Sequence, residues 1–109
     1  MKPEQQQIAI AEACGWAKCE HLASLDLTIG ITPVNNPPKY GTYENGRAEL
    51  PDYPNDLNAM HEAEKVLTHE QFDDYYVRLC MKMRRPYHAT AAQRAEAFLR
   101  TLGLWEDQP

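Results

Sequence analysis

Residues 51–67, PDYPNDLNAMHEAEKVL, predict the helix around which the rest of the chain is arranged. Asn55 or Asp56 can cap its first turn, because a short polar side chain accepts a hydrogen bond from an otherwise unpaired amide. At about 100° per residue, the apolar side chains share one half of the helix. They are Leu57, Ala59, Met60, Ala63, Val66 and Leu67. We therefore expect a helix over 55–67 that packs against a core.

Glu64 is the exception on this apolar half, because it lies between Leu57 and Met60 on the helix surface. A carboxylate at that position must reach the rim of the core or find a cation. Two interpretations stay open. It is either a rim carboxylate paired with a lysine or arginine, or a buried acid in a binding cleft.

The composition predicts one soluble domain. A chain of 109 residues with 43% hydrophobic and 25% charged residues can bury one core but not two. The odd number of cysteines and the polar start MKPEQQQ favour reduced thiols in the cytoplasm. No apolar run approaches the roughly 20 residues that span a bilayer, so we expect no membrane partner.

The net charge of −5 is unevenly distributed along the chain. Residues 44–74 carry nine acids and two bases, whereas residues 75–100 carry six bases and one acid. Such a dipole can pair within the fold or orient a charged partner. The overall acidity argues against binding to nucleic acid.

Residues 3–14 predict the first helix, since Pro3 suits a first turn and Gly15 suits a helix end. This helix is apolar on two sides, because Ile8 and Ile10 point in nearly opposite directions. A helix of this kind either lies within the core or meets another subunit.

A small sheet is predicted in the next part of the chain. Residues 25–32, LDLTIGIT, alternate between apolar and polar, which is typical of a half-buried strand. A Pro-rich loop over 33–39 follows, and Asn45-Gly46 indicates a tight hairpin over 40–50. The residues expected on the buried side of the strand are Leu25, Leu27, Ile29 and Ile31.

Two capping boxes predict the last two helices. Thr68 with Gln71 begins a helix over 69–83, and Thr90 with Gln93 begins one over 90–102. The apolar side expected for the first of these two helices consists of Phe72, Tyr75, Tyr76, Leu79, Cys80 and Met83. The fold class is therefore α+β: a small antiparallel sheet of about three strands covered by about four helices.

Three groups of residues resemble small proteins encoded by phages and prophages. They are Gly15-Trp16, the run from Asp52-Tyr53 through Leu67, and the run from Ala89 through Leu99 followed by Gly103. Together they are similar to the phage ABA sandwich domain family, a layered helix–sheet–helix fold with no assigned activity. The resemblance implies a phage context, and therefore the cytoplasm of a host cell, and transfers no catalytic residue. In that family strands follow the central helix, whereas here residues 72–83 have a helical period.

The sequence contains no strong metal motif. Cys14, Cys19 and His21 have the spacing C-x4-C-x-H, which matches no common zinc pattern. The zincin motif H-E-x-x-H begins at His61 but has Lys65 in place of its second histidine. Cys80 lies on a predicted apolar helix face, which favours an inert thiol. We therefore assign no metal, no cofactor and no catalytic residue.

A basic cluster is the best candidate for binding. It consists of Arg78, Lys82, Arg84 and Arg85, beside Tyr75 and Tyr76, with Glu64 as a further candidate. Arginine offers paired donors to phosphate, and tyrosine supplies a surface for stacking. The alternative is that these bases are a solvated face that balances the acidic half.

These observations predict a small phage accessory protein that acts by stoichiometric binding and not as an enzyme. Its target would be a host protein, such as a defence component, or a phosphate-bearing signal molecule. Two alternatives stay open. One is a self-associating structural domain that forms a homo-oligomer without ligand, and the other is an unrecognised metalloprotein or hydrolase.

Overall fold

The α+β class is confirmed by the computed structural model, which describes residues 1–32, 47–82 and 86–107. Its four α-helices are α1 (Pro3–Ala13), α2 (Leu57–Glu64), α3 (His69–Lys82) and α4 (Ala91–Thr101). The strands are β1 (Ala17–Leu22), β2 (Leu27–Ile31) and β3 (Arg47–Glu49), and a short 3-10 helix η2 covers Pro86–His88. The predicted Pro-rich loop and most of the predicted hairpin lie outside the described residues.

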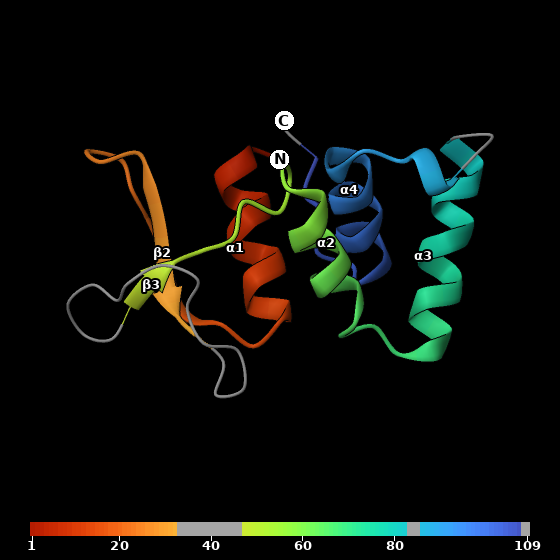
Figure 1. Cartoon of the computed structure of the whole chain (residues 1–109), viewed down its shortest axis with the longest axis horizontal. Coiled ribbons are helices and arrows are strands. Elements are labelled where there is room, and N and C mark those ends of the chain that lie inside the picture. The colour runs from red at the N-terminus through yellow and green to blue at the C-terminus, as the bar shows by residue number, and fades with distance from the viewer. Residues whose placement is uncertain (33–46, 83–85, 108–109) are drawn as a thin grey trace.

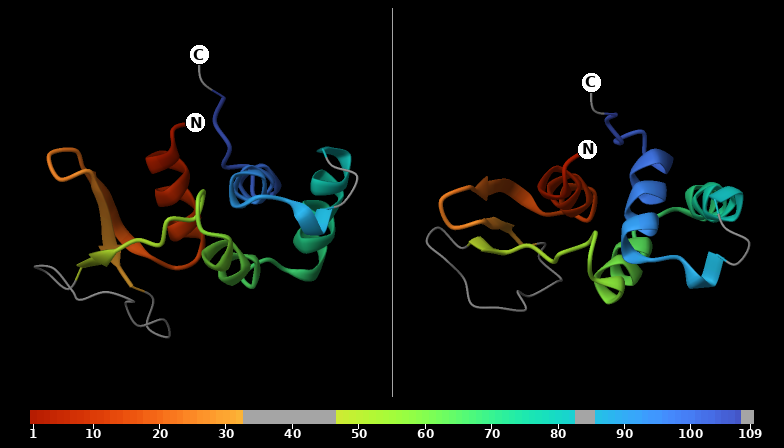
Figure 2. Two further views of the ribbon diagram at one scale, coloured as in Figure 1. Left: turned by 45° about the horizontal axis from the view of Figure 1, so that its top comes forward. Right: turned by 90° about the horizontal axis from the view of Figure 1, so that it is seen from above.

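The elements follow one another along the long axis of the molecule, which measures 44 Å (Figure 1). The sheet forms one end, α1 packs against it, α2 and α4 come next, and α3 forms the other end (Figures 1 and 2). α4 packs against α1, α2 and α3, so it is the centre of the helical part. The helices therefore do not form one layer over the sheet, because α1 alone separates the sheet from α4.

α1 begins and ends where the sequence predicts. The Lys2 amide donates to Oε1 of Gln5, and Gly15 follows the helix with a φ of 99°, a conformation that glycine adopts without strain. Ile10 and Ala11 are fully buried, and α1 lies between the sheet and α4. Its two apolar sides are therefore explained by burial in the core, which was one of the two alternatives.

β1 was not predicted, because its sequence, AKCEHL, does not alternate between apolar and polar. The strand contains an irregularity between Ala17 and Glu20, where Lys18 has a φ of 51°. A bulge of this kind breaks the period of two that identifies a strand. β2 begins two residues later than the predicted strand 25–32, since Leu25 and Asp26 lie in the turn that joins β1 to β2.

The predicted buried side of β2 is confirmed at Ile29, which is 5% exposed, but the opposite side of the strand is buried as well. Gly30 is opposite Ala48 in the antiparallel ladder, and a Cβ on Gly30 would lie 2.8 Å from Sγ of Cys19. Ala48 and Cys19 belong to the core that includes α1, so Gly30 faces that core. Ile29 and its odd-numbered neighbours point to the other side. A side chain at position 30 has no room, because Cys19, the Ala17 carbonyl oxygen and the Leu50 side chain lie close to it.

The described strands are joined by one charged contact on the side away from α1. Arg47 of β3 pairs with Glu20 of β1, so the two outer strands are linked across β2. Arg47 lies opposite Ile31 in the ladder, which places this pair on the same side as the isoleucines. The pair therefore covers apolar surface with the long arginine stem.

The other three helices match the prediction closely at their N-terminal ends. Asp56 caps α2 by accepting from the amide of Asn58, and both predicted capping boxes are formed, at Thr68 and at Thr90. Gly103 ends α4 with a φ of 71°, as expected. α2 is shorter than predicted, since residues 65–67 form a turn.

The apolar side predicted for α3 is broader than the side that packs. Only Tyr75 and Leu79 are buried, whereas Phe72, Tyr76 and Cys80 are exposed. Met83 lies outside the described residues. The reason is that α3 is at the end of the molecule, where α4 covers only a narrow strip of it.

Substitution of Gly30 by alanine is expected to destabilise the fold by about 1–3 kcal/mol, the usual cost of overpacking. The added methyl would meet Cys19 Sγ at 2.8 Å and the Ala17 carbonyl oxygen at 3.2 Å. Urea denaturation measures the effect. The double variant Gly30→Ala/Cys19→Ala should recover part of the loss, because it removes the closest contact. If the double variant instead loses the sum of the losses of the two single variants, the packing described is contradicted.

Candidate functional site

The residues predicted to bind a ligand do not form one site. Glu64 and Tyr75 come together in the interior, whereas Tyr76 and Arg78 lie on the outer surface of α3. The side chain of Lys82 and the residues Arg84 and Arg85 lie outside the described part of the structure. The described members therefore form one internal pair and one external pair, with no cleft shared between them.

Glu64 pairs with Arg94, which the sequence analysis missed. Oε1 of Glu64 lies 3.3 Å from Nη1 of Arg94 and 3.2 Å from Nδ1 of His61. The two charged side chains of the ion pair are only 11% and 10% exposed. Nε of Arg94 also donates to the carbonyl oxygen of Ala89 at 3.2 Å. The interpretation of Glu64 as a paired carboxylate is confirmed.

Tyr75 of α3 completes this buried polar group. Its side chain is fully buried, and burial raises the pKa of its hydroxyl, with the nearby Glu64 carboxylate acting in the same direction. The hydroxyl is therefore neutral and lies beside the ion pair. Glu64 comes from the end of α2, Arg94 from α4 and Tyr75 from α3, so the group joins three helices where they meet.

The sequence held a signal for Arg94. It lies on the apolar face of the predicted last helix, three residues after Ala91 and four before Phe98. A base on one apolar face and an acid on another are explained together if they pair, because an unpaired buried charge is unfavourable. Glu64 alone was recognised as out of place, and its partner could have been found by the same test.

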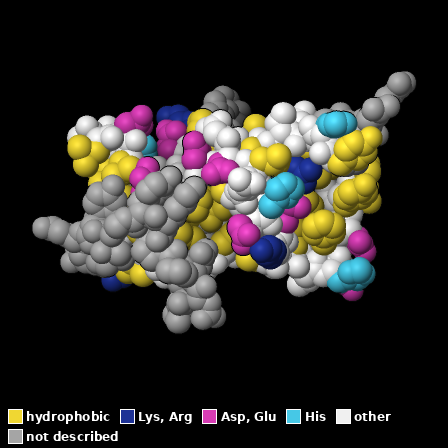
Figure 3. Space-filling model, viewed as in Figure 1, with side chains coloured by type: hydrophobic (Ala, Val, Ile, Leu, Met, Phe, Trp, Pro, Cys, Tyr) yellow, Lys and Arg dark blue, Asp and Glu magenta, His cyan; other side chains and the backbone are white. Residues whose placement is uncertain are grey.

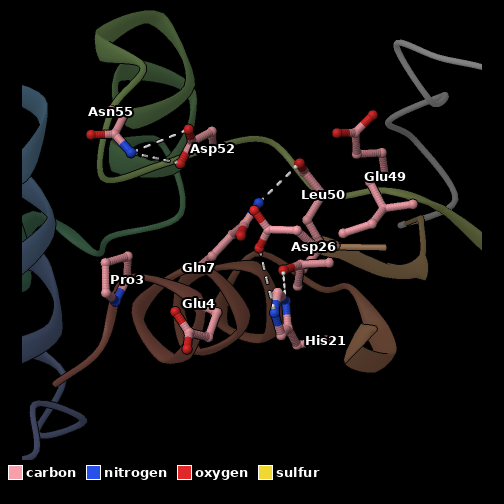
Figure 4. A pocket seen from close by; sticks show the side chains of 11 residues that line it. Pro3, Glu4, Gln7, His21, Asp26, Glu49, Leu50, Asp52 and Asn55 are labelled. Atoms are coloured by element: carbon pink, nitrogen blue, oxygen red, sulfur yellow. Dashed lines mark hydrogen bonds and ion pairs between the residues drawn. The ribbon is translucent and has the colours of Figure 1, made fainter. Parts of the chain in front are cut away.

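A polar pocket of about 290 Å³ lies at the other end of the molecule (Figure 4). It is bounded by the N-terminal half of α1, by β1, β2 and β3, and by the turn before α2. Its carboxylates are Glu4, Asp26, Glu49 and Asp52. None of the residues predicted to bind a ligand lines it, because the sequence does not show that these distant segments meet.

Several polar groups of this pocket have partners within the fold. Nδ1 of His21 lies 2.9 Å from Oγ1 of Thr28, and its Nε2 lies 3.8 Å from Asp26 (Figure 4). Nε2 of Gln7 donates to the carbonyl oxygens of Leu50 and Pro51. These bonds fix α1 to the chain that leaves β3, so we interpret the pocket lining as structural.

Cys14, Cys19 and His21 do not form a metal site. Within the described residues, no three of the side chains His, Cys, Asp and Glu are grouped so that they could hold a metal ion. Burial raises the pKa of Cys14 and of Cys19 to about 11, so both are neutral thiols near pH 7. Cys80 is exposed, and the prediction that it is buried on the apolar side of its helix was wrong.

Several exposed apolar side chains lie on the outer half of α3. We call the surface they form the exposed α3 face, and it consists of Phe72, Tyr76, Val77, Cys80 and Met81. The exposed fractions are 40% for Phe72, 49% for Tyr76, 54% for Val77 and 82% for Met81. Hydrophobic side chains gather over this end of the molecule (Figure 3). Arg78 is engaged beside this face, since its Nε lies 3.2 Å from Asp74.

Comparisons with protein-family models, with curated proteins and with solved structures found no match to this chain. The resemblance to the phage ABA sandwich domain family therefore stays a prediction. One further finding concerns membranes: among the described residues, every helix is too short or too polar to cross a bilayer.

Substitution of Arg94 by methionine is expected to destabilise the protein by roughly 3 kcal/mol, because it leaves the Glu64 carboxylate without its guanidinium in a mostly buried position. Urea denaturation measures the change in the free energy of unfolding. The matched control is Lys65→Met, which removes an exposed pair with Glu62 and should cost less than about 1 kcal/mol. Equal losses in the two variants would contradict the role assigned to Arg94.

Cys80 is expected to react with iodoacetamide at pH 8 much faster than Cys14 and Cys19. The reason is that Cys80 is exposed, whereas burial keeps the pKa of the other two near 11 and leaves on the order of 0.1% thiolate. Peptide mapping by mass spectrometry after timed labelling gives the three rates. The labelling rates in unfolded protein serve as the reference. If the three cysteines react at comparable rates in the folded protein, the burial of Cys14 and Cys19 is contradicted.

Proposed function

We propose that the protein acts by stoichiometric contact with another protein, through the exposed α3 face. The observation that supports this proposal is that four large apolar side chains on the outer half of α3, at the end of the molecule, are each at least 40% exposed. Contiguous apolar surface on a soluble protein marks sites of interaction. Aromatic residues and methionine are also enriched in the centres of protein interfaces.

The geometry favours a protein over a phosphate-bearing ligand. Of the residues predicted to receive a phosphate, Arg78 is bonded to Asp74, and Tyr75 is buried beside Glu64 and Arg94. Among the described residues, the surface of α3 with its paired Arg78 offers no enclosed set of donors for a phosphate group. An apolar surface of the same shape is suited to a partner that covers it.

The biological setting rests on the resemblance alone. If the chain is a phage accessory protein, its partner is a protein of the phage or of the host, and contact with a host defence component is the counter-defence role predicted from the sequence. The exposed α3 face does not distinguish a phage partner from a host partner. The experiment therefore measures whether any partner is bound through this face.

The variant Val77→Asp is expected to abolish the contact, since it places a carboxylate between Tyr76 and Met81 on the exposed α3 face. Tagged wild-type protein and the variant are expressed in the cells that carry the gene, together with a second copy bearing a different tag. Bound proteins are identified and counted by mass spectrometry. The control is Leu25→Asp, which makes the same kind of change at a 68% exposed leucine in the turn between β1 and β2.

A partner present at a fixed ratio, lost with Val77→Asp and kept with Leu25→Asp, supports the proposal. Circular dichroism and the urea midpoint show that each variant is folded. If folded Val77→Asp keeps every partner of the wild type, or if no copy and no other protein binds at a fixed ratio, the proposed function is wrong.

A further inference from the structure

We infer that the partner of the exposed α3 face is a different protein, which contacts this face with a lysine or arginine set among apolar side chains. The inference rests on the proposed function and names the chemistry of the partner. It is argued from a carboxylate that lies among the apolar residues of the face, from the charged groups near that carboxylate and from the net charge of the chain.

Asp73 lies on the same side of α3 as the apolar residues of the face. Residues three and four apart are neighbours on a helix surface, so Asp73 is next to Tyr76 and Val77. Cys80 follows Val77 by three residues and continues the same strip. The Asp73 side chain is 68% exposed, so water surrounds its carboxylate in the unbound protein. A partner that covers Tyr76 and Val77 must therefore also cover Asp73.

The chain itself neutralises this carboxylate only weakly. Among the described side chains, the ion-pair contact of Asp73 is with Nε2 of His69, at 3.8 Å, and a histidine is charged only when it is protonated. Arg78 is bonded to Asp74, with its Nε 3.2 Å from the carboxylate. Glu70 is exposed one turn before Asp73, so it adds a second carboxylate on this side of the helix.

Covering Asp73 determines what the partner must bring. A carboxylate that loses its water without gaining a cation opposes binding strongly. A lysine or arginine of the partner placed over Asp73 offsets this cost, and it also approaches Glu70. Apolar side chains beside that cation then cover Tyr76 and Val77. The segment that fits the exposed α3 face is therefore both basic and apolar.

A second copy of this chain fits the requirement poorly. The chain has a net charge of −5, so two copies repel each other, whereas a basic protein is attracted. Arg78 does not supply the cation, because it is bonded to Asp74 within its own chain. At about 100° per residue, Arg78 also lies on a different side of α3 from Asp73. Charge complementarity therefore favours a different, basic partner over self-association.

Reversal of the charge at position 73 tests the inference in the same capture experiment. Asp73→Lys should lower the amount of bound partner by about tenfold or more, because it sets like charges together across the contact. The matched control is Glu62→Lys, which changes the net charge equally at a 69% exposed side chain on α2 and should leave capture unchanged. Circular dichroism and the urea midpoint show that both variants are folded.

An apolar residue at position 73 distinguishes a basic partner from a purely apolar one. Biolayer interferometry with the partner, purified after its identification by mass spectrometry, gives the dissociation constant. Asp73→Leu should raise this constant by about tenfold, because the partner's cation loses its carboxylate. About 0.5 M NaCl should weaken binding of the wild type more than binding of Asp73→Leu. If Asp73→Leu binds more tightly than the wild type, the contact is purely apolar and the inference is overturned.

The two proposals can fail separately. If a different protein is lost with Val77→Asp but kept with Asp73→Lys, the chemistry inferred for the partner is wrong and the proposed function stands. The same holds if a second copy is the only protein that is bound and lost with Val77→Asp. If no bound protein depends on Val77, both proposals are wrong.

Discussion

The ion pair between Glu64 and Arg94 determines how the helical part of this fold is assembled. α2, α3 and α4 meet where the pair lies, and the Tyr75 hydroxyl is buried next to it. Breaking such a pair leaves an isolated charge in a place that water reaches poorly. The three helices are therefore held in one arrangement, since other packings of their apolar faces would separate the two charges. This constraint also leaves the outer side of α3 free of intramolecular contacts with α4.

The sheet depends on a different constraint, which is close approach. Gly30 lies opposite Ala48 in the ladder, and its missing side chain leaves room for Cys19 and Leu50. Gln7 donates to two carbonyl oxygens of the chain that leaves β3, which fixes α1 at the same place. α1 is therefore held by polar contacts on one side and by apolar packing on the other. Because α1 packs against both the sheet and α4, it connects the two parts of the molecule.

The sequence was sufficient to predict the helices, because their ends carry chemistry that acts locally. The capping boxes at Thr68 and Thr90 and the glycines after α1 and α4 depend only on neighbouring residues. The sheet was harder to predict. The bulge in β1 hides its period, and the choice between the two sides of β2 depends on what lies opposite, which a single strand does not show. Glu64 was recognised as unusual, but its partner is 30 residues away and could be identified only by asking which other charge is out of place.

The elongated order of the elements has a consequence for how a local change spreads through the molecule. The sheet and α3 lie at opposite ends of a body 44 Å long. Because α1 and α4 connect the sheet to α3, any influence of one end on the other would have to pass through these two helices.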